Sequence, residues 1–386
     1  MGMKILHTSD WHLGKRLMER ERLPEQKRVL AEIANICEER DVELVLVAGD
    51  VFDSYLPPAE AEEVFFRFVK EIAGEKRAVA VISGNHDDGV RLSASAPLAA
   101  DDGVYIFGGR SQAFPVGGNR PVRAVEAGES YVIIENSKGE RVYINALPYP
   151  NEARLKEEKT EESYAEKAQR WIRAGDAAYD GKMPHILLTH LFVAGGCVAE
   201  SERDISLGGA RAVPISALPD FGYTALGHLH RGQKAGNYAR YSGSLLQYSF
   251  DEAGTEKGAI LLETGEEGIT VLEEIPFKEG VRLVRLEAAS VDDALTLLRM
   301  HEGKYIELTL RLSAPLSAVE TKALREANEG LITVIARVDA SEESPIVRRA
   351  KLSAGELFAE YYRTQFSKEP EAQLSEAFLR LVEEGS

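Results

Sequence analysis

The chain of 386 residues has two cysteines, no long apolar run and no excess of basic residues. Two cysteines, Cys37 and Cys197, cannot form a disulfide framework, which favours a reduced, cytoplasmic protein. No apolar stretch reaches the roughly 18 residues that a membrane-spanning helix needs, so we expect no membrane association. The 46 Lys and Arg against 63 Asp and Glu give a net charge of −17. That charge argues against holding nucleic acid through the overall field, but it is compatible with a local site where metal ions reverse the sign.

The composition is typical of a folded protein with more than one domain. Hydrophobic residues make up 44% and charged residues 28%, which indicates a globular chain and argues against a disordered one. At about 150 residues per domain, this length corresponds to two or three domains. We find no internal repeat of solenoid period.

The first ninety residues alternate between strand and helix patterns. Continuous apolar runs predict strands that end in polar residues, and helical spacing of apolar residues predicts helices over 22–39 and 59–74. The three predicted strands cover 3–10, 43–50 and 78–87. This alternation indicates parallel strands with right-handed crossovers and an α/β fold.

Two further strand-to-loop units and two hairpins follow. The units cover 185–192 and 223–230, and the hairpins cover 131–149 and 258–277. Residues 152–173 carry balanced charge around a weak apolar stripe, which we interpret as a solvated helix face.

From Gly280 the pattern changes to a compact strand–helix–strand–helix–strand unit that ends near residue 338, with Ser290 and Ser317 as helix caps. A polar break at 341–345 precedes two short amphipathic helices. Their apolar residues are Leu357, Phe358, Tyr361, Tyr362 and Phe366 in the first and Leu374, Phe378, Leu381 and Val382 in the second. We predict three domains: 1–276, 277–344 and 345–386.

Chemically reactive side chains follow five of the predicted strands. The segments are Asp10-Trp11-His12, Gly49-Asp50, Gly84-Asn85-His86-Asp87, His190 and Gly227-His228-Leu229-His230. Because ligands bind outside the carboxyl ends of strands in an open α/β sheet, these segments can converge on one crevice. The glycines let the backbone turn sharply and approach the site closely.

Aspartate, asparagine and imidazole together suit a divalent metal such as manganese, iron or zinc. The absence of cysteine from the set argues against a structural zinc site. The seven candidate ligands are Asp10, His12, Asp50, Asn85, His190, His228 and His230. They are too many for one tetrahedral centre and suit two metals that share a bridging carboxylate.

These five motifs, in this order, resemble those of the calcineurin-like metallophosphoesterases. The stretches SDWHLG, AGDVFD, SGNHD, ALGHLH and YSGSLLQYSF further resemble the SbcD family of nucleases, the bacterial counterparts of the archaeal and eukaryotic double-strand-break repair nucleases. The resemblance implies a calcineurin-like α/β core, a small α/β capping domain that contacts DNA, and a helical tail. The tail segment ELFAEYY resembles the part of the family that binds the coiled-coil ATPase SbcC.

The resemblance also implies roles for single residues. One metal is bound by Asp10, His12, Asp50 and His230, and the other by Asp50, Asn85, His190 and His228, so that Asp50 bridges the two ions. His86 resembles the histidine that contacts the scissile phosphate and protonates the leaving oxygen, with Asp87 fixing its tautomer.

The activity implied by the resemblance is that of a two-metal, manganese-dependent DNA nuclease. It would be a 3′→5′ double-strand exonuclease and a single-strand or hairpin endonuclease. The chain would act as a homodimer within a heterotetramer with SbcC on DNA ends and hairpins. No P-loop motif occurs, so the partner would handle ATP. The alternatives are a phosphoesterase for nucleotides or small phosphodiesters, and a scaffold with a degenerate site.

Several other residues have simpler interpretations. We interpret His7, His185 and His301 as structural, Cys37 as a core residue, and Trp11 and Phe52 as packing groups; a ligand role for Cys197 has little support. Asp53 is either a neighbour of the ligands or a loop acid. Six basic residues follow the motifs and either contact DNA phosphate or carry ordinary surface charge. They are Lys15, Arg16, Arg91, Arg231, Lys234 and Arg240. The acidic balance predicts weak, salt-sensitive DNA binding by this chain alone.

Overall fold

A computed structural model describes residues 2–109, 114–150, 161–197, 212–266, 268–338, 353–366, 368–370 and 372–384. The chain divides into two compact units. The first comprises Met1–Arg285 with His301–Glu307, and the second comprises Leu286–Met300 with Leu308–Ser386.

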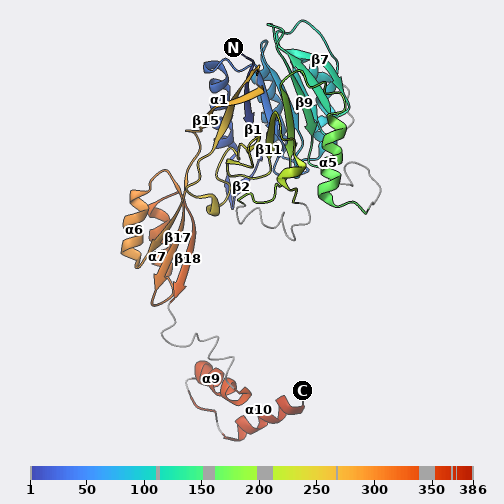
Figure 1. The fold of residues 1–386 in the computed structure, drawn as a ribbon. Helices are drawn as coiled ribbons and strands as arrows, with labels where there is room; N and C mark the ends of the chain where they lie inside the picture. The colour runs from blue at the N-terminus through green and yellow to red at the C-terminus, as the bar shows by residue number, and fades with distance from the viewer. Residues whose placement is uncertain are drawn as a thin grey trace. The chain divides into compact units, whose positions relative to one another are not determined.

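The first unit contains a six-stranded sheet with the order β15-β14-β1-β4-β5-β6 (Figure 1). Its strands are β1 (Lys4–Thr8), β4 (Leu44–Ala48), β5 (Ala78–Ile82), β6 (Val104–Phe107), β14 (Gly258–Gly265) and β15 (Gly268–Pro276). The strands β1, β4 and β5 run parallel, as predicted, and β6, which was not predicted, adds a fourth parallel strand. Every residue of β4 and β5 is buried, which explains why both strands are continuous apolar runs. The hairpin predicted over 258–277 is confirmed as the antiparallel pair β14–β15.

A seven-stranded sheet has the order β12-β13-β11-β10-β9-β8-β7. Its strands are β7 (Arg123–Gly128), β8 (Tyr131–Glu135), β9 (Arg141–Leu147), β10 (His185–His190), β11 (Tyr223–Gly227), β12 (Gln233–Lys234) and β13 (Ala239–Tyr241). The predicted hairpin over 131–149 is confirmed as β8–β9. The strands β9, β10, β11 and β13 run parallel. The two late strand-to-loop units therefore belong to a second sheet and do not extend the first.

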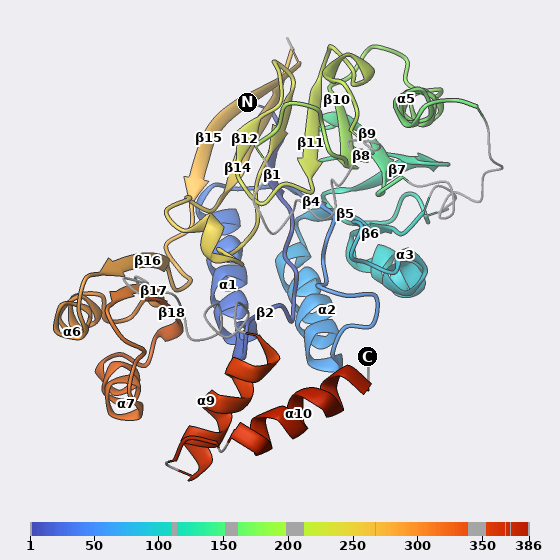
Figure 2. The ribbon, with the colours of Figure 1, turned by 90° about the horizontal axis from the view of Figure 1, so that it is seen from below.

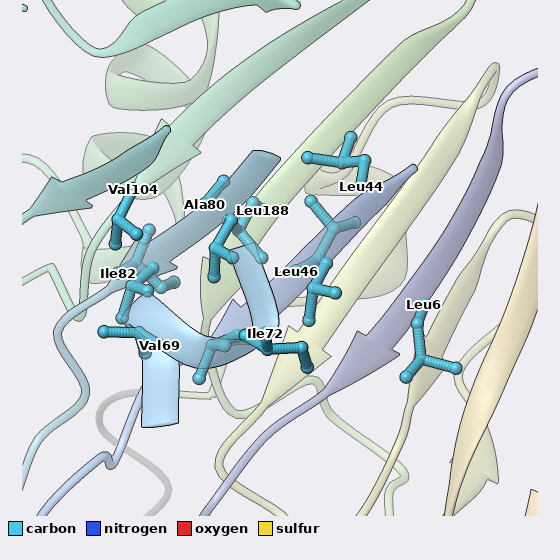
Figure 3. Close-up of a cluster of buried hydrophobic side chains, with 14 of the residues drawn as sticks. Leu6, Leu44, Leu46, Val69, Ile72, Ala80, Ile82, Val104 and Leu188 are labelled. Atoms are coloured by element: carbon cyan, nitrogen blue, oxygen red, sulfur yellow. The ribbon is translucent and has the colours of Figure 1, made fainter. Parts of the chain in front are cut away.

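The main hydrophobic core lies between the two sheets. Leu188 of β10 belongs to the same buried cluster as Leu46 of β4 and Ala80 of β5 (Figure 3). Its neighbour Leu187 packs in a separate cluster with Trp171. This alternation follows from the period of two in a strand, so that β10 contributes one face to each cluster.

Helices cover the outer faces of both sheets (Figure 2). The helices α1 (Leu23–Glu39) and α2 (Ala59–Ala73) lie against the first sheet, and α5 (Tyr164–Gly175) lies against the second. A capping box between Ser163 and Glu166 starts α5, and Trp171 is buried. The described part of 152–173 is thus a packed helix, because its apolar stripe covers β9 and β10; residues 151–160 lie outside the described residues. The short elements are β2 (Arg16–Leu17), β3 (Arg20–Glu21), α3 (Gly89–Leu92) and α4 (Ala96–Ala99).

The predicted strand–helix–strand–helix–strand order after Gly280 is confirmed. A three-stranded sheet has the order β16-β17-β18. The elements are β16 (Leu283–Ala288), α6 (Val291–Met300), β17 (Tyr305–Leu312), α7 (Ala318–Ala327) and β18 (Leu331–Val338). Ser317 caps α7 in a capping box with Glu320, and the Ser290 hydroxyl accepts from the Asp293 N–H at 3.1 Å.

The two amphipathic helices predicted at the end of the chain are present as α9 (Ala354–Phe366) and α10 (Ala372–Glu384). The rings of Phe358 and Phe378 stack with their centroids 4.3 Å apart. Other apolar side chains remain exposed, among them Tyr361 at 61% and Leu374 at 43%. The predicted break at 341–345 and the domain boundary after 344 lie outside the described residues. No helix among the described residues is long and apolar enough to span a membrane.

We expect Leu46→Ala to destabilise the first unit by about 2–5 kcal/mol, because the side chain is fully buried between the sheets and truncation leaves a cavity. The measurement is urea unfolding followed by the fluorescence of Trp11 and Trp171, which are both buried in this unit. Leu272→Ala is the control, because Leu272 is 46% exposed, and it should change the unfolding free energy by no more than about 0.5 kcal/mol. Equal effects of the two substitutions would contradict the assignment of the core.

Candidate metal centre

The five predicted segments meet at one place, where the carboxyl ends of strands from both sheets lie together. Asp10, Asp50 and Asn85 follow strands β1, β4 and β5 of the first sheet, while His190 ends β10 and His228 follows β11 of the second. The five segments therefore converge as predicted, but they come from two packed sheets. The inter-sheet core beneath them holds both sets of loops in place.

Four of the candidate ligands have left-handed backbone conformations. The φ angles are 51° at Asp10, 43° at His12, 48° at Asp50 and 104° at His228. Such conformations cost about 1–3 kcal/mol each outside glycine and persist where surrounding structure holds them. Here the loops hold one another: the N–H of Asp10 donates to the Gly49 carbonyl at 3.0 Å and that of His12 to the Asp50 carbonyl at 2.9 Å. Concentrated strain of this kind is typical of functional sites.

Glycines allow the loops to approach this closely. A Cβ atom at Gly84 would lie 2.1 Å from Oδ1 of Asp50, and one at Gly227 would lie 1.8 Å from the Ala48 carbonyl oxygen. Neither position has room for any side chain. The expected role of these glycines in close approach is confirmed.

The candidate ligands form two adjoining groups around Asp50. In the first, Nε2 of His12 lies 3.0 Å from Nε2 of His230 and 3.5 Å from Oδ2 of Asp50. Asp10, His12 and His230 have ligand atoms within 4.8 Å of one another. In the second group, Nε2 of His190 lies 3.4 Å from the same Oδ2 of Asp50, which is therefore the shared atom.

Asn85 connects the histidines of the second group. Its Oδ1 lies 2.9 Å from Nε2 of His190 and 2.9 Å from Nδ1 of His228. The backbone N–H of His228 donates to both carboxylate oxygens of Asp10 at 3.0 and 3.1 Å. The structure thus brings all seven candidate ligands together.

The hydrogen-bond pattern of His190 tests whether a cation fits here. Its Nδ1 lies 2.8 Å from the Ala48 carbonyl oxygen, and a carbonyl only accepts, so Nδ1 carries a proton. In the neutral ring, Nε2 then directs a lone pair at Oδ1 of Asn85 and Oδ2 of Asp50, which are acceptors as well. Without metal these three atoms can come together only with a second proton on Nε2, and a divalent cation would take the place of that proton. The nitrogen and oxygen donors fit such an ion.

The protonation of the buried histidines agrees with a centre of negative charge. Burial lowers the pKa of His12 to about 4 and that of His228 to about 3, so both rings are neutral at pH 7. Burial also acts to lower the pKa of His190, but the carboxylates of Asp50 and Asp10 outweigh it and raise the value to about 9. Although burial opposes its ionisation, Asp50 has a pKa well below the usual range because His190 and His12 stabilise its charge.

His86 lies half-buried beside this centre. Its backbone N–H donates to Oδ1 of Asp50 at 2.8 Å, and its Nδ1 lies 2.9 Å from the backbone carbonyl oxygen of Asp53. Since the carbonyl only accepts, it holds the proton of His86 on Nδ1. His12, Asp50 and His86 also have ligand atoms within 4.8 Å of one another.

Asp87 differs from its prediction, in which it fixes the tautomer of His86. Its carboxylate accepts from the backbone N–H groups of Gly84 at 2.8 Å, Val51 at 3.1 Å and Phe52 at 2.9 Å. Burial and the nearby charge of Asp50 raise the pKa of Asp87 to about 6. Asp87 therefore joins the loops after β4 and β5, while the carbonyl of Asp53 takes the role that we predicted for Asp87.

The two open interpretations of Asp53 are resolved by its contacts. Its Oδ1 lies 3.3 Å from Nδ1 of His12 and 2.5 Å from Nζ of Lys15. Burial acts to raise the pKa of this carboxyl, but His12 and Lys15 lower it below its ordinary value. Asp53 is thus a direct neighbour of a candidate ligand.

Two buried charged residues at the centre were missed in the sequence. Glu252 and Lys257 form an ion pair of 2.6 Å, and Oε1 of Glu252 lies 3.1 Å from Nδ1 of His230. Both follow the stretch YSGSLLQYSF, which carried the family resemblance without an assigned chemistry. No spacing pattern signals them, because their contact with His230 depends on how the chain folds back after β13.

The residues interpreted as structural lie outside the centre. His7 is buried with Nδ1 3.0 Å from the Tyr223 hydroxyl, and His185 lies 2.8 Å from Asp176. Half-buried His301 lies in the turn before β17, buried Cys37 in α1, and Cys197 is exposed. The packing roles of Trp11 and Phe52 are confirmed, since both rings contact Phe65 in the core.

The candidate DNA contacts are mostly engaged in ion pairs. The pairs are Lys15–Asp53, Arg16–Glu21, Arg91–Glu62 and Arg240–Glu274. Arg231 and Lys234 are exposed. The weak, salt-sensitive binding of DNA by this chain alone stays a prediction.

Comparison with known proteins adds independent information. Residues 3–232 match the family described as calcineurin-like phosphoesterase. A Bacillus subtilis (strain 168) protein, named as the SbcD component of the nuclease SbcCD, is 35% identical over 404 aligned residues, with 98% of each chain covered. Proteins with the same name from Rhodobacter capsulatus and Staphylococcus epidermidis are 33% and 30% identical. The alignment with the Rhodobacter capsulatus protein covers 85% of this chain and 85% of that protein. The alignment with the Staphylococcus epidermidis protein covers 68% of this chain and 66% of that protein.

We expect His7 to make the fold sensitive to acid. Burial lowers its pKa from 6.5 to about 3, so below pH 6.5 the unfolded chain binds a proton that the folded chain does not. The free energy of unfolding should then fall by about 1.4 kcal/mol per pH unit from this group as the pH drops from 6.5 towards 3.

His7→Gln removes this titration. Urea unfolding at pH 6, 5.5 and 5 should show a pH slope that is shallower in the variant by about 1.4 kcal/mol per unit. Between pH 8 and 7.5 the slopes should agree, since His7 is neutral in both states. Parallel slopes over the whole range would show that His7 is protonated in the fold.

Proposed function

The chain belongs to the calcineurin-like phosphoesterases and, within them, to the SbcD family of the SbcCD nucleases, and from this premise we propose that it hydrolyses the phosphodiester bonds of DNA. Members of this family bind divalent metals, and the candidate centre has a donor set of nitrogen and oxygen atoms that suits such ions. The observation that supports the proposal most directly is the position of Asp50, whose Oδ2 lies within 3.5 Å of both His12 and His190.

We assign the ligands to two manganese ions. One ion would be bound by Asp10, His12, Asp50 and His230. The other would be bound by Asp50, Asn85, His190 and His228. Asp50 would bridge the two ions, in agreement with its contacts to a histidine of each group.

Divalent ions bound here would polarise the scissile phosphate and make a water molecule more acidic. The chain supplies the remaining chemistry. The Asp53 carbonyl holds a proton on Nδ1 of His86, so Nε2 exchanges the catalytic proton. We propose that His86 contacts the scissile phosphate and donates a proton from Nε2 to the leaving oxygen. Its half-buried position leaves the ring within reach of substrate.

The proposed substrates are DNA ends and hairpins, cleaved by 3′→5′ exonuclease and single-strand endonuclease activities. The alternative substrates, nucleotides and small phosphodiesters, are separated from DNA by comparing rates on hairpin DNA, mononucleotides and bis-p-nitrophenyl phosphate. Faster hydrolysis of mononucleotides than of hairpin DNA would favour the alternative.

We propose that the chain acts in the cytoplasm as a homodimer within a heterotetramer with an SbcC-type ATPase. The three predicted domains would divide the work: residues 1–276 cleave DNA, 277–344 contact it, and 345–386 bind the ATPase. Exposed apolar side chains on α9 and α10, such as Tyr361 and Leu374, support the last assignment, because short amphipathic helices commonly dock into a partner.

His86→Ala should keep both metal ions and lower the rate of hairpin cleavage by about 10²–10⁴-fold, which is the usual contribution of a general acid. Metal content is measured by mass spectrometry after dialysis, beside a manganese-dependent nuclease assay. His301→Ala, outside the centre, should retain both metal and activity. Loss of a metal ion from His86→Ala would make this histidine a ligand and refute its assignment as the acid.

Deletion from Lys351 onward should abolish binding to the ATPase and leave the hydrolysis of bis-p-nitrophenyl phosphate unchanged. The reason is that every candidate ligand lies before residue 231, whereas the deleted segment begins after the small strand–helix unit that ends with β18. Co-purification of the two proteins tests the first expectation. Retained binding by the truncated chain would place the partner surface elsewhere.

A further inference from the structure

Behind His230 lies a buried pair of charges that the proposed mechanism does not use. Glu252, at the end of a short 3-10 helix (Phe250–Glu252), is 3% exposed, and Lys257 is 5% exposed. Their ion pair, Oε2 to Nζ, measures 2.6 Å. Burying two charges costs several kcal/mol of desolvation per ion, and a well-packed apolar pair is often at least as stable. The pair therefore calls for an explanation other than stability.

Both charged groups contact the same residue. Oε1 of Glu252 lies 3.1 Å from Nδ1 of His230. Nζ of Lys257 donates to the backbone carbonyl of His230 at 2.6 Å and to the Ser244 hydroxyl at 2.9 Å. The carboxylate of Glu252 thus contacts the ring of His230, and the ammonium group of Lys257 holds the backbone of His230.

The carboxylate decides which nitrogen of His230 carries the proton. A carboxylate only accepts, so Nδ1 of the neutral ring is the protonated atom and Nε2 keeps its lone pair. That Nε2 is the atom 3.0 Å from Nε2 of His12. The ring is therefore held in the tautomer that can bind a metal through Nε2.

His190 in the other group is oriented differently. Its Nδ1 faces the Ala48 carbonyl at 2.8 Å, which is a neutral acceptor that belongs to the backbone and that no substitution removes. A carboxylate acceptor makes an imidazole a stronger ligand than a neutral acceptor does. The two halves of the centre thus differ in the charge behind the ligand.

We propose that Glu252 and Lys257 are positioning residues that hold His230 as the Nδ1-protonated tautomer and thereby set the affinity of the half-site formed by Asp10, His12 and His230. The inference rests on the proposed two-metal function and deepens it, because it assigns a separate control to one ion. The two half-sites can consequently be weakened one at a time.

Glu252→Gln gives the sharpest test, because Lys257 only donates. The ammonium should capture the amide oxygen, which turns the amide NH₂ group towards Nδ1 of His230 and forces the proton onto Nε2. We expect one Mn²⁺ to bind about 10–100-fold more weakly and the second to keep its affinity, as measured by calorimetric titration with Mn²⁺. In the metal-free protein, ¹⁵N NMR of labelled histidines should show His230 change from the Nδ1–H to the Nε2–H form.

A second substitution separates positioning from simple stability. In Glu252→Gln with Lys257→Met, the amide oxygen is free to accept from Nδ1 again, so Mn²⁺ affinity should recover in part and the Nδ1–H signal should return. Glu256→Gln is the matched control, because it removes the same charge from an exposed neighbour, and it should bind both ions as the wild type does.

Two results would overturn the inference: two Mn²⁺ ions bound to Glu252→Gln with wild-type affinity, or an unchanged His230 tautomer. Loss of both ions equally in Glu252→Gln, with no recovery in the double variant, would also refute it. Failure of the proposed function has a different signature, since the wild type itself would then bind fewer than two Mn²⁺ ions. The tautomer measurement, made without metal, is independent of that result.

Discussion

The structure of the centre depends on one contact between the two sheets, the hydrogen bond from Nδ1 of His190 to the Ala48 carbonyl. His190 ends a strand of the second sheet, and Ala48 ends a strand of the first. Through this bond the second sheet places an imidazole beside Asp50, which follows Ala48 by two residues. The meeting of His190 and His228 with the ligands of the first sheet requires that the two sheets keep this register.

Backbone hydrogen bonds between neighbouring loops hold the loops that carry the ligands in place. Asp87 ties the β4 and β5 loops through three backbone N–H groups, and the β1 and β4 loops are hydrogen-bonded to each other at Asp10 and His12. These bonds explain how four non-glycine residues stay in left-handed conformations. Backbone contacts stabilise these strained conformations, so the carboxylate and imidazole side chains are not needed for that purpose and face one another.

Much of the centre could be predicted because its residues follow strands directly in the sequence. Asp10 and Asp50 lie within two residues of a strand end, and the direction of a parallel strand determines where its next residue points. Three features could not be predicted. The division into two sheets depends on which edges pair. The role of Asp87 depends on backbone donors in another loop. The pair Glu252–Lys257 lies 22 and 27 residues after His230 in the sequence, beyond β12 and β13.

The packing of the inter-sheet core has a mechanical consequence for chemistry. His12 and His190 contact the same oxygen of Asp50 from opposite sheets, so the distance between these two imidazoles depends on how thick the sandwich is at that level. A side chain such as Leu188, two residues before His190 and wholly inside, acts as a spacer for that thickness. A change in the size of buried apolar residues that never meet substrate can therefore shift His190 relative to Asp50 and His12.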